Sequence, residues 1–182
     1  MSEIVSRGRR IEVLFSADEL ARRNAELAAE IARDVGTTPL VIAILKGSFI
    51  FAADLIRALH GAGVTPEVEF MGLSSYRAGT QSSGAVSIVR DIETDVTGRR
   101  IVLIDDILES GRTIAFARDL LIARGASSVH ACVLLDKPGK RAVEFEADFV
   151  GFPCPDRFVV GYGMDVGHAF RELPFVGVVA SD

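Results

Sequence analysis

The chain has 182 residues, enough for one domain with a sizeable core and too few for two ordinary ones. Its 25 acidic and 20 basic side chains give a formal charge of −5, which argues against non-specific binding to nucleic acid or to an anionic membrane. Hydrophobic residues make up 49% of the chain and charged residues 25%, as is typical of a soluble globular protein.

The cysteine content and the first residues bear on the compartment. Cys132 and Cys154 are far apart and have no CxxC spacing, so they are interpreted as reduced thiols. No apolar stretch approaches the roughly 20 residues of a membrane span. The N-terminal segment MSEIVSRGRR lacks the apolar core of a signal peptide. These features predict a cytoplasmic protein without a membrane partner.

The first predicted element is a helix over residues 16–36. Ser16 or Asp18 can cap its start, and Gly36 can close its end. Its apolar residues recur at helical spacing and form one stripe, which consists of Leu20, Leu27 and Ile31.

The next segments alternate between strand and helix. Residues 39–45 are continuously apolar and predict a strand buried on both faces. Residues 48–63 return to helical character, and residues 67–76 resume strand character, with residues 86–92 predicted to pair with them. The Ser- and Gly-rich segment 74–87 is interpreted as a mobile loop that acts as a lid.

The second half of the chain begins with another strand–helix–strand unit. Residues 100–105 and 129–136 predict strands, and residues 113–126 predict the helix between them; after residue 137 only short strands around turns are expected. Repeated strand–helix units predict an α/β fold with a mostly parallel central sheet and helices on both faces. The chain has no internal repeat or linker, so residues 1–182 are predicted to form a single domain.

The most informative stretch is IVLIDDILESGRTIAFARDLL, residues 101–121. Asp105 and Asp106 end an apolar strand, at the sheet edge where open α/β folds bind ligands. Gly111 allows the turn to bring backbone N–H groups near a ligand, and the helix that begins near Thr113 points its positive end there. Such a site holds a phosphate on one side and sugar hydroxyls or a phosphate-bound Mg²⁺ on the other. A sugar phosphate satisfies both sides.

An acid pair after a strand is by itself explained equally well as helix-capping or solvated groups. The whole string of strand, Asp-Asp, two apolar residues, acid, Ser, Gly, basic residue and Thr is more specific. It resembles the phosphoribosyl-pyrophosphate loop of type I phosphoribosyltransferases. From about Leu45 to the C-terminus the chain is similar to the hypoxanthine-guanine phosphoribosyltransferase family, in the segments LKGSFIFAADLIR, SSY, LLDKP, DFVGF and PDRFVVGYGMD.

This resemblance implies a type I phosphoribosyltransferase fold, with a small hood formed by about residues 152–182. It implies a purine salvage enzyme that uses Mg²⁺ and transfers the phosphoribosyl group of phosphoribosyl pyrophosphate to N9 of hypoxanthine or guanine. Pyrophosphate is released, and IMP or GMP is formed. Because the transition state is like an oxocarbenium ion, catalysis depends mainly on positioning and on stabilising the leaving polyanion. A homodimer or homotetramer is also implied.

The resemblance assigns roles around the sugar phosphate. Glu109 is implied to be the catalytic base near purine N7, where the family usually has Asp, and its extra methylene displaces the carboxylate by about 1 Å or more. From the residues alone, Glu109 is equally a solvated loop acid. The residues implied to bind phosphoribosyl pyrophosphate are Lys46, Gly47, Asp105, Asp106, Glu109, Ser110, Gly111, Arg112, Thr113 and Arg171.

Further roles follow for the base, the metal and the lid. The implied purine-binding residues are Lys137, Phe158, Val159 and Asp165. The implied Mg²⁺ ligands are Asp105, Asp106 and Asp165, and the lid residues are Ser75 and Tyr76. Without the resemblance to this family, Lys137 and Arg171 would be interpreted as surface residues. Phe158, an aromatic residue next to valines, would be interpreted as part of a core.

Two other functions were weighed. A regulatory RNA-binding protein on the same fold requires a basic face, which the acidic balance opposes. A phospho-receiver domain has its acids near the N-terminus, whereas too little chain follows Asp106 for that fold. Three scattered histidines, His60, His130 and His168, have no metal-ligand spacing.

Overall fold

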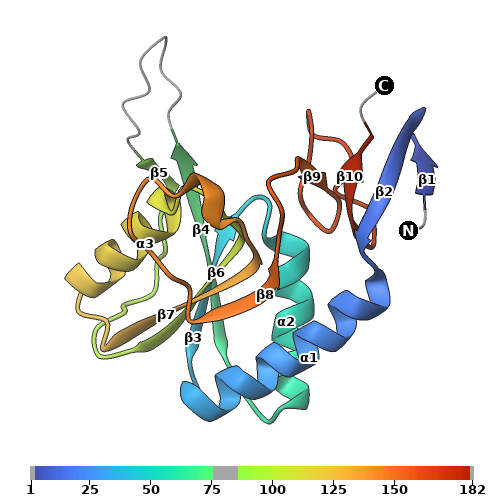
Figure 1. Cartoon of the computed structure of the whole chain (residues 1–182). Coiled ribbons are helices and arrows are strands. Elements are labelled where there is room, and N and C mark those ends of the chain that lie inside the picture. Colours follow the sequence, from blue (N-terminus) through green and yellow to red (C-terminus); the bar gives the residue numbers. More distant parts are fainter. Residues whose placement is uncertain (1–2, 76–85, 181–182) are drawn as a thin grey trace.

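The computed structural model describes residues 3–75 and 86–180, except for the side chain of Ser75. Two bodies are visible in Figure 1: a larger one on a six-stranded sheet and a smaller one on a four-stranded sheet. We call the smaller sheet with its connecting turns the hood.

The larger sheet has the strand order β5-β4-β3-β6-β7-β8. Its strands are β3 (Leu40–Leu45), β4 (Glu67–Ser75), β5 (Val86–Arg90), β6 (Arg100–Leu108), β7 (Ser128–Asp136) and β8 (Phe149–Pro153). All neighbours are parallel except β4 and β5, which are antiparallel. The prediction of an α/β fold with a mostly parallel sheet is confirmed.

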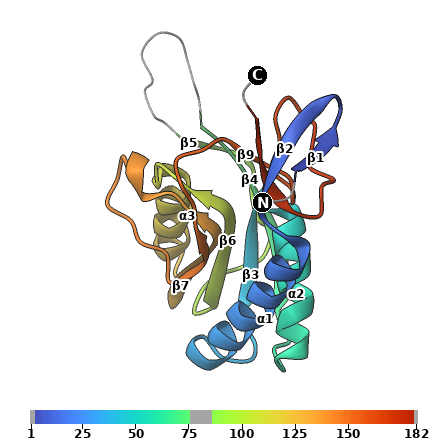
Figure 2. The ribbon, with the colours of Figure 1, turned by 45° about the vertical axis from the view of Figure 1, so that its right-hand side comes forward.

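Helices cover both faces of this sheet. Figure 2 shows α3 (Arg112–Ala123) on one side and α1 (Ala17–Asp34) and α2 (Phe49–Gly61) on the other. The apolar residues of β3 alternate between the two resulting cores, with Val41 and Ala43 facing one and Ile42 and Ile44 the other. A strand buried on both faces must be apolar throughout, which is why its period-two pattern is missing from the sequence.

The start of α1 is defined by a capping box. The Ser16 hydroxyl accepts a hydrogen bond from the Glu19 N–H at 3.3 Å, and the Ser16 N–H donates to the Glu19 carboxylate at 2.8 Å. Ser16, not Asp18, is therefore the N-cap. At the other end Gly36 has a φ of +103° and its N–H reaches the Ile31 carbonyl, so the predicted helix is confirmed at both ends.

The hood combines both ends of the chain. Its strand order is β1-β2-β10-β9, and its strands are β1 (Glu3–Ser6), β2 (Arg9–Phe15), β9 (Val159–Val160) and β10 (Val176–Val179). Sequence analysis placed the hood at about residues 152–182 and did not assign residues 3–15 to it. The hood has a core of its own, formed by Ile11, Val160, Phe170 and Phe175.

Tyr162 attaches the hood to the helices. Its hydroxyl donates to Asp54 on α2 at 2.6 Å and accepts from the Asn24 amide on α1 at 2.8 Å. Burial and the bond to Asp54 raise the pKa of Tyr162, so the hydroxyl keeps its proton and remains a donor. These two hydrogen bonds join α1, α2 and the hood, which are distant from one another in sequence.

The predicted loop 74–87 begins and ends in strands. Ser74 pairs with Ser87 and Ser75 pairs with Val86, so the predicted pairing of these two strands is confirmed. Residues 76–85, including Tyr76, lie outside the described residues. Within the described parts of the chain, no helix is long and apolar enough to span a membrane.

Candidate active site

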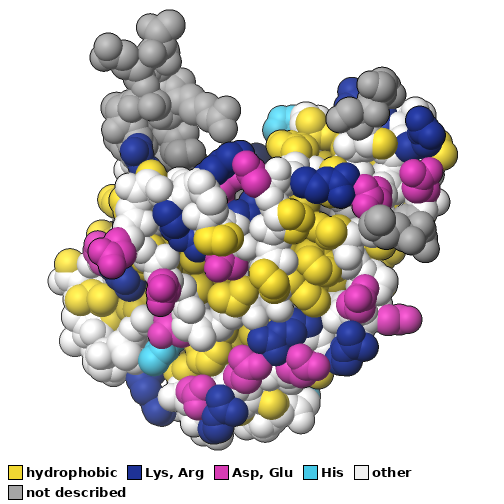
Figure 3. All heavy atoms as spheres, in the orientation of Figure 1, with side chains coloured by type: hydrophobic (Ala, Val, Ile, Leu, Met, Phe, Trp, Pro, Cys, Tyr) yellow, Lys and Arg dark blue, Asp and Glu magenta, His cyan; other side chains and the backbone are white. Residues whose placement is uncertain are grey.

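Two cavities open at the carboxyl ends of the parallel strands, with volumes of about 710 and 500 Å³. They share part of their lining and are one continuous hollow: Leu45, Lys46, Gly47, Leu73, Asp106, Ile107 and Glu109 line both. In Figure 3, basic and acidic side chains gather in the notch between the larger body and the hood. We call the larger cavity the hood cavity and the smaller one the turn cavity.

The structure brings the predicted site residues together. The predicted site residues that line the turn cavity are Lys46, Gly47, Asp105, Asp106, Glu109, Ser110, Gly111, Arg112 and Thr113. The hood cavity adds Lys137, Phe158, Val159, Asp165 and Arg171. Of the predicted residues, only the lid pair cannot be placed, because Tyr76 and the Ser75 side chain are outside the described part.

Of the acid pair, Asp106 lines both cavities, whereas Asp105 lines the turn cavity only. Asp105 is 8% exposed and lies within β6, which continues to Leu108, so the predicted end of this strand at residue 105 was three residues too early. Its carboxylate accepts the Asp106 N–H at 3.0 Å. Burial and the neighbouring Asp106 raise the pKa of Asp105 well above its ordinary value, and loss of hydration also raises the pKa of Asp106. Both carboxylates would be stabilised by a cation or by hydroxyl donors.

The loop after β3 touches this pair directly. The Leu45–Lys46 peptide bond is cis, and the buried Ser48 hydroxyl donates back to the Ile44 carbonyl in β3. A methyl group added to Gly47 would lie 1.7 Å from Oδ2 of Asp106. Only glycine fits at this position while the Asp106 side chain keeps its place.

The turn from Ser110 to Thr113 forms the end of the turn cavity. Gly111 has a φ of +79° and is the N-cap of α3, and it supplies no side-chain capping bond. The free N–H groups and the dipole of a helix N-terminus favour an anion. A phosphate therefore suits this end of the hollow.

The hood cavity is the more apolar of the two. Phe158 is 62% exposed at its edge, beside the buried Val159 and Met164. Lys137 follows β7, is 6% exposed, and donates from Nζ to the Arg157 carbonyl at 2.7 Å. An exposed ring next to a buried ammonium suits a planar, polar-edged ligand.

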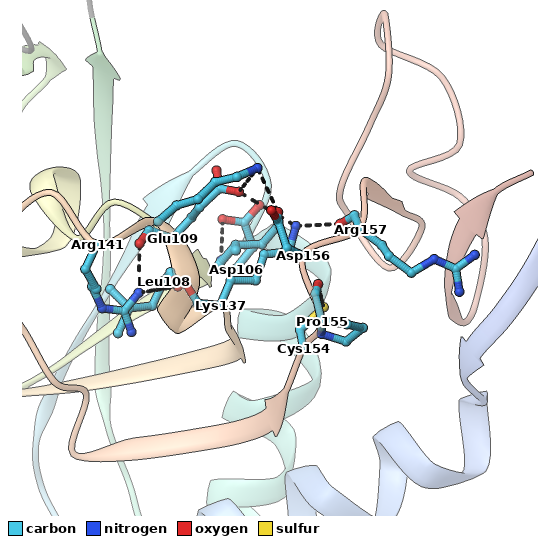
Figure 4. A network of polar contacts seen from close by, with 11 residues as sticks. Asp106, Leu108, Glu109, Lys137, Arg141, Cys154, Pro155, Asp156 and Arg157 are labelled. Atoms are coloured by element: carbon cyan, nitrogen blue, oxygen red, sulfur yellow. Dashed lines mark hydrogen bonds and ion pairs between the residues drawn. The ribbon is translucent and has the colours of Figure 1, made fainter. Parts of the chain in front are cut away.

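Glu109 lies where the two cavities join. Its Oε1 is 3.9 Å from Nζ of Lys137 and 3.7 Å from Nζ of Lys140. Figure 4 shows Glu109 and Lys137 beside each other. Lys140, in the short 3₁₀ turn Pro138–Lys140, also pairs with Asp156 at 2.7 Å. The carboxylate therefore faces the hollow with ammonium groups beside it.

Two residues with different predicted roles are paired with each other. Arg171 contacts Oδ1 of Asp165 through Nη2 at 2.8 Å and donates from Nη1 to the Gly163 carbonyl at 2.6 Å. The other Asp165 oxygen accepts the His168 N–H at 2.7 Å. In this state Asp165 is engaged with protein groups.

The carboxylates fit Mg²⁺. Among the described residues no group of three or more His, Cys, Asp or Glu side chains could hold a metal ion by itself. Adjacent Asp105 and Asp106 at the turn cavity are the set that Mg²⁺ uses, since it takes one or two carboxylates and completes its shell with water and substrate oxygens.

Several lining residues escaped sequence analysis. Met164, Ile107 and Arg90 line the hood cavity, although no role was given to them. Arg90 could have been found only from the strand pairing, which sets it opposite Gly72. Met164 lies within the quoted segment PDRFVVGYGMD and carried no chemical signal of its own.

The fold and the hollow define a class of protein that binds a phosphorylated ligand beside a planar one. A family model described as "phosphoribosyl transferase domain" matches residues 12–166. The hypoxanthine-guanine phosphoribosyltransferase of Streptococcus mutans is 40% identical over 172 residues, which are 94% of each chain. The bifunctional protein TilS/HprT of Listeria monocytogenes is 44% identical over 169 residues, and the chain spans only 26% of its length.

A solved structure agrees with these relatives. The hypoxanthine phosphoribosyltransferase of Staphylococcus aureus has a TM-score of 0.86 and 38% identity, over 93% of this chain and 91% of that one. The chain therefore belongs to the phosphoribosyltransferases, and among them to the hypoxanthine-guanine phosphoribosyltransferase family.

Proposed function

We propose that the protein transfers the 5-phosphoribosyl group from phosphoribosyl pyrophosphate to N9 of a 6-oxopurine, hypoxanthine or guanine, and releases pyrophosphate. The observation that carries the proposal is the position of Asp105 and Asp106. Both line the cavity that ends at the turn from Ser110 to Thr113, and Asp106 also lines the more apolar cavity that has the exposed ring of Phe158. A ribose held there has its 5′-phosphate at the turn and its C1 toward the base.

The sugar phosphate is bound by the segment after β6. Backbone amides from Glu109 to Thr113, with the hydroxyls of Ser110 and Thr113 and the cation of Arg112, hold the 5′-phosphate. Asp105 and Asp106 bind the ribose hydroxyls directly or through Mg²⁺. A bound Mg²⁺ would neutralise charge on the pyrophosphate and so favour its departure.

The purine is bound in the hood cavity. Phe158 stacks on the ring, and the Val159 backbone bonds to its edge. Lys137 donates to the exocyclic 6-oxygen while it stays anchored near the Arg157 carbonyl. Glu109, at the junction of the cavities, accepts the proton at N7 as the base forms its bond to C1.

The leaving pyrophosphate is bound on the far side of C1. The backbone of Lys46 and Gly47 and the guanidinium of Arg171 are its donors. Asp165 would hold a second Mg²⁺ in place of its present contact with Arg171, and this ion would neutralise further charge on the pyrophosphate. Ser75 and Tyr76 close over the site and exclude water.

The wider setting rests on the family and on composition. We propose one domain over residues 1–182, a cytoplasmic location, and a homodimer or homotetramer. No role in binding nucleic acid is proposed, because the net charge is −5.

A turnover assay tests the proposed function. The protein is incubated with Mg²⁺, phosphoribosyl pyrophosphate and one base, either hypoxanthine, guanine, xanthine or uracil, and nucleotide is measured. Nucleotide is expected with hypoxanthine or guanine and not with uracil. Tight binding of phosphoribosyl pyrophosphate without turnover of any base would contradict the proposal and favour a regulator built on the same fold.

A further inference from the structure

The basic residue Arg141 lies behind the site and makes more contacts than any role given so far requires. It follows the Pro138–Lys140 turn, and its side chain is 20% exposed. Its Nη1 donates to the carbonyls of Leu108 at 2.7 Å and Glu109 at 2.8 Å. Figure 4 shows the guanidinium beside Leu108 and Glu109.

The same side chain is fixed from three other directions. Nη1 also reaches the Lys137 carbonyl at 3.2 Å, and Nε donates to the Phe145 carbonyl at 3.2 Å. Nη2 pairs with Oδ1 of Asp136 at the end of β7. A planar fork held by a carboxylate and several carbonyls has one orientation, which a flexible ammonium cannot reproduce.

The carbonyls that face Arg141 determine where the adjacent amides point. In a trans peptide the C=O of one residue and the N–H of the next point in opposite directions. The carbonyls of Leu108, Glu109 and Ser110 all bond to the segment 137–143, the last of them through the Ala142 N–H at 2.9 Å. The N–H groups of the three residues that follow are therefore directed away from that segment, as an anion-binding nest requires.

Arg141 has a specific part in this arrangement. The carbonyls of Leu108 and Ser110 also accept backbone N–H groups, at 2.9 Å from Lys137 and from Ala142. Within the described residues, the Glu109 carbonyl accepts only from Arg141. The orientation of the Glu109–Ser110 peptide, and so the direction of the Ser110 N–H, depends on this one side chain.

We infer that Arg141 is a positioning residue, which orients the Glu109–Ser110 peptide so that the Ser110 N–H faces the 5′-phosphate and the Glu109 side chain faces the base. The inference rests on the proposed function, because it assigns a device that shapes the phosphate end of that same site. Asp136 is the second part of the device, since its carboxylate holds the guanidinium in place.

Direct binding of ribose 5-phosphate tests the inference without requiring turnover. Titration calorimetry is carried out on the unchanged protein, on Arg141→Lys and on Asp136→Asn, after thermal melting has shown that each is folded. We expect the Kd to rise about 10-fold in Arg141→Lys, the effect of one lost hydrogen bond to a charged group. A smaller rise in Kd of about threefold is expected in Asp136→Asn, because this variant keeps all the hydrogen-bond donors of Arg141 and loses only the carboxylate that holds them in place.

The matched control is Arg124→Lys. Arg124 also forms a two-bond pair with an aspartate, Asp91, but it lies at the C-terminal end of α3 and touches no carbonyl of the turn. Its variant is expected to bind ribose 5-phosphate unchanged. A purely structural role for Arg141 would lower the melting temperature and leave the Kd of the folded protein unaltered.

The outcomes distinguish a failure of the role inferred for Arg141 from a failure of the proposed function. Folded Arg141→Lys and Asp136→Asn proteins that bind ribose 5-phosphate as tightly as the unchanged protein would overturn the inference alone. Should Arg141→Lys fail to fold, Asp136→Asn decides the question by the same titration. An unchanged protein that does not bind ribose 5-phosphate would instead contradict the proposed function.

Discussion

The two halves of the hollow are built in different ways. The phosphate half comes mainly from one uninterrupted segment, Asp105 to Thr113, which is the end of a strand, a turn and the start of a helix, with Lys46 and Gly47 added by the loop after β3. The purine half takes Lys137 from the end of β7 and Phe158 and Val159 from the hood, whose sheet includes strands from residues 3–15. A site made from one segment is encoded locally, whereas a site made from many depends on packing between distant parts.

The strongest test of this comparison concerns the residue at the junction. Glu109 belongs to the phosphate segment, yet its proposed partner is the purine. We expect Glu109→Gln to lower kcat about 1,000-fold at neutral pH, because an amide cannot accept the N7 proton. The kcat of this variant is measured by steady-state kinetics with hypoxanthine or guanine. Glu146→Gln, an exposed acid in the loop before β8, is the control, and an undiminished rate in Glu109→Gln would reject its role as the base.

A second test addresses the fit between the loop after β3 and the acid pair. Gly47→Ala places a methyl group 1.7 Å from Oδ2 of Asp106 and must displace one of them. We expect kcat/KM to fall about 100-fold, as for a misplacement of about 1 Å. Gly61→Ala, which meets nothing within 4 Å at the end of α2, should retain full activity. Equal activities of the two variants would show that the contact has no catalytic consequence.

A third test destabilises the core of the hood in one variant and the core of the central sheet in another. Ile11→Val in the hood and Ile101→Val in the central sheet each remove one methylene from a fully buried side chain. Each should lower the free energy of unfolding by about 1 kcal/mol. We expect only Ile11→Val to raise the KM for the purine, about threefold, while both leave unchanged the Kd for ribose 5-phosphate, which has no pyrophosphate for Arg171 of the hood to bind. A purine KM that rises equally in both would refute the division into two halves.

The smallest expected effect is one of stability. Because the pKa of Asp105 is raised in the folded protein, ionising it costs free energy of folding, and this cost is present above the folded pKa and disappears as pH falls below the unfolded value of about 4. Asp105→Asn should therefore melt about 2–6 °C higher at pH 8 without Mg²⁺ or substrate, although it loses activity. The gain should shrink toward pH 4. A gain that is independent of pH would point to another cause.

Local chemistry explains what the sequence revealed. Gly111 and the start of α3 are set by residues within one short segment, so their arrangement followed from the order of residue types, whereas β6 continues to Leu108, beyond its predicted end. The same holds for Ser16 and Gly36, which delimit α1 by bonds to residues no more than five positions away. Such contacts can be anticipated from one sequence.

What remained hidden depends on long-range pairing. Residues 3–15 lack a strong alternating pattern, and only pairing with β10 shows that they form strands of the hood. Arg141 looked like one of several basic residues after a Pro-Gly turn, because the carbonyls it binds lie 32 and 33 positions earlier in the chain. The pairing of Asp165 with Arg171 was likewise not anticipated, since each had been given a separate ligand.

The ion pair between Glu12 and Arg157 links the beginning of the chain to substrate choice. Glu12 lies on β2 and contacts Arg157 at 2.6 Å, and the Arg157 carbonyl in turn accepts the Lys137 ammonium. Proteolytic trimming of the first fifteen residues would remove this connection and leave β10 with β9 as its one remaining sheet neighbour. Discrimination between bases is then expected to suffer before binding of the sugar phosphate, whose turn from Ser110 to Thr113 lies outside the hood.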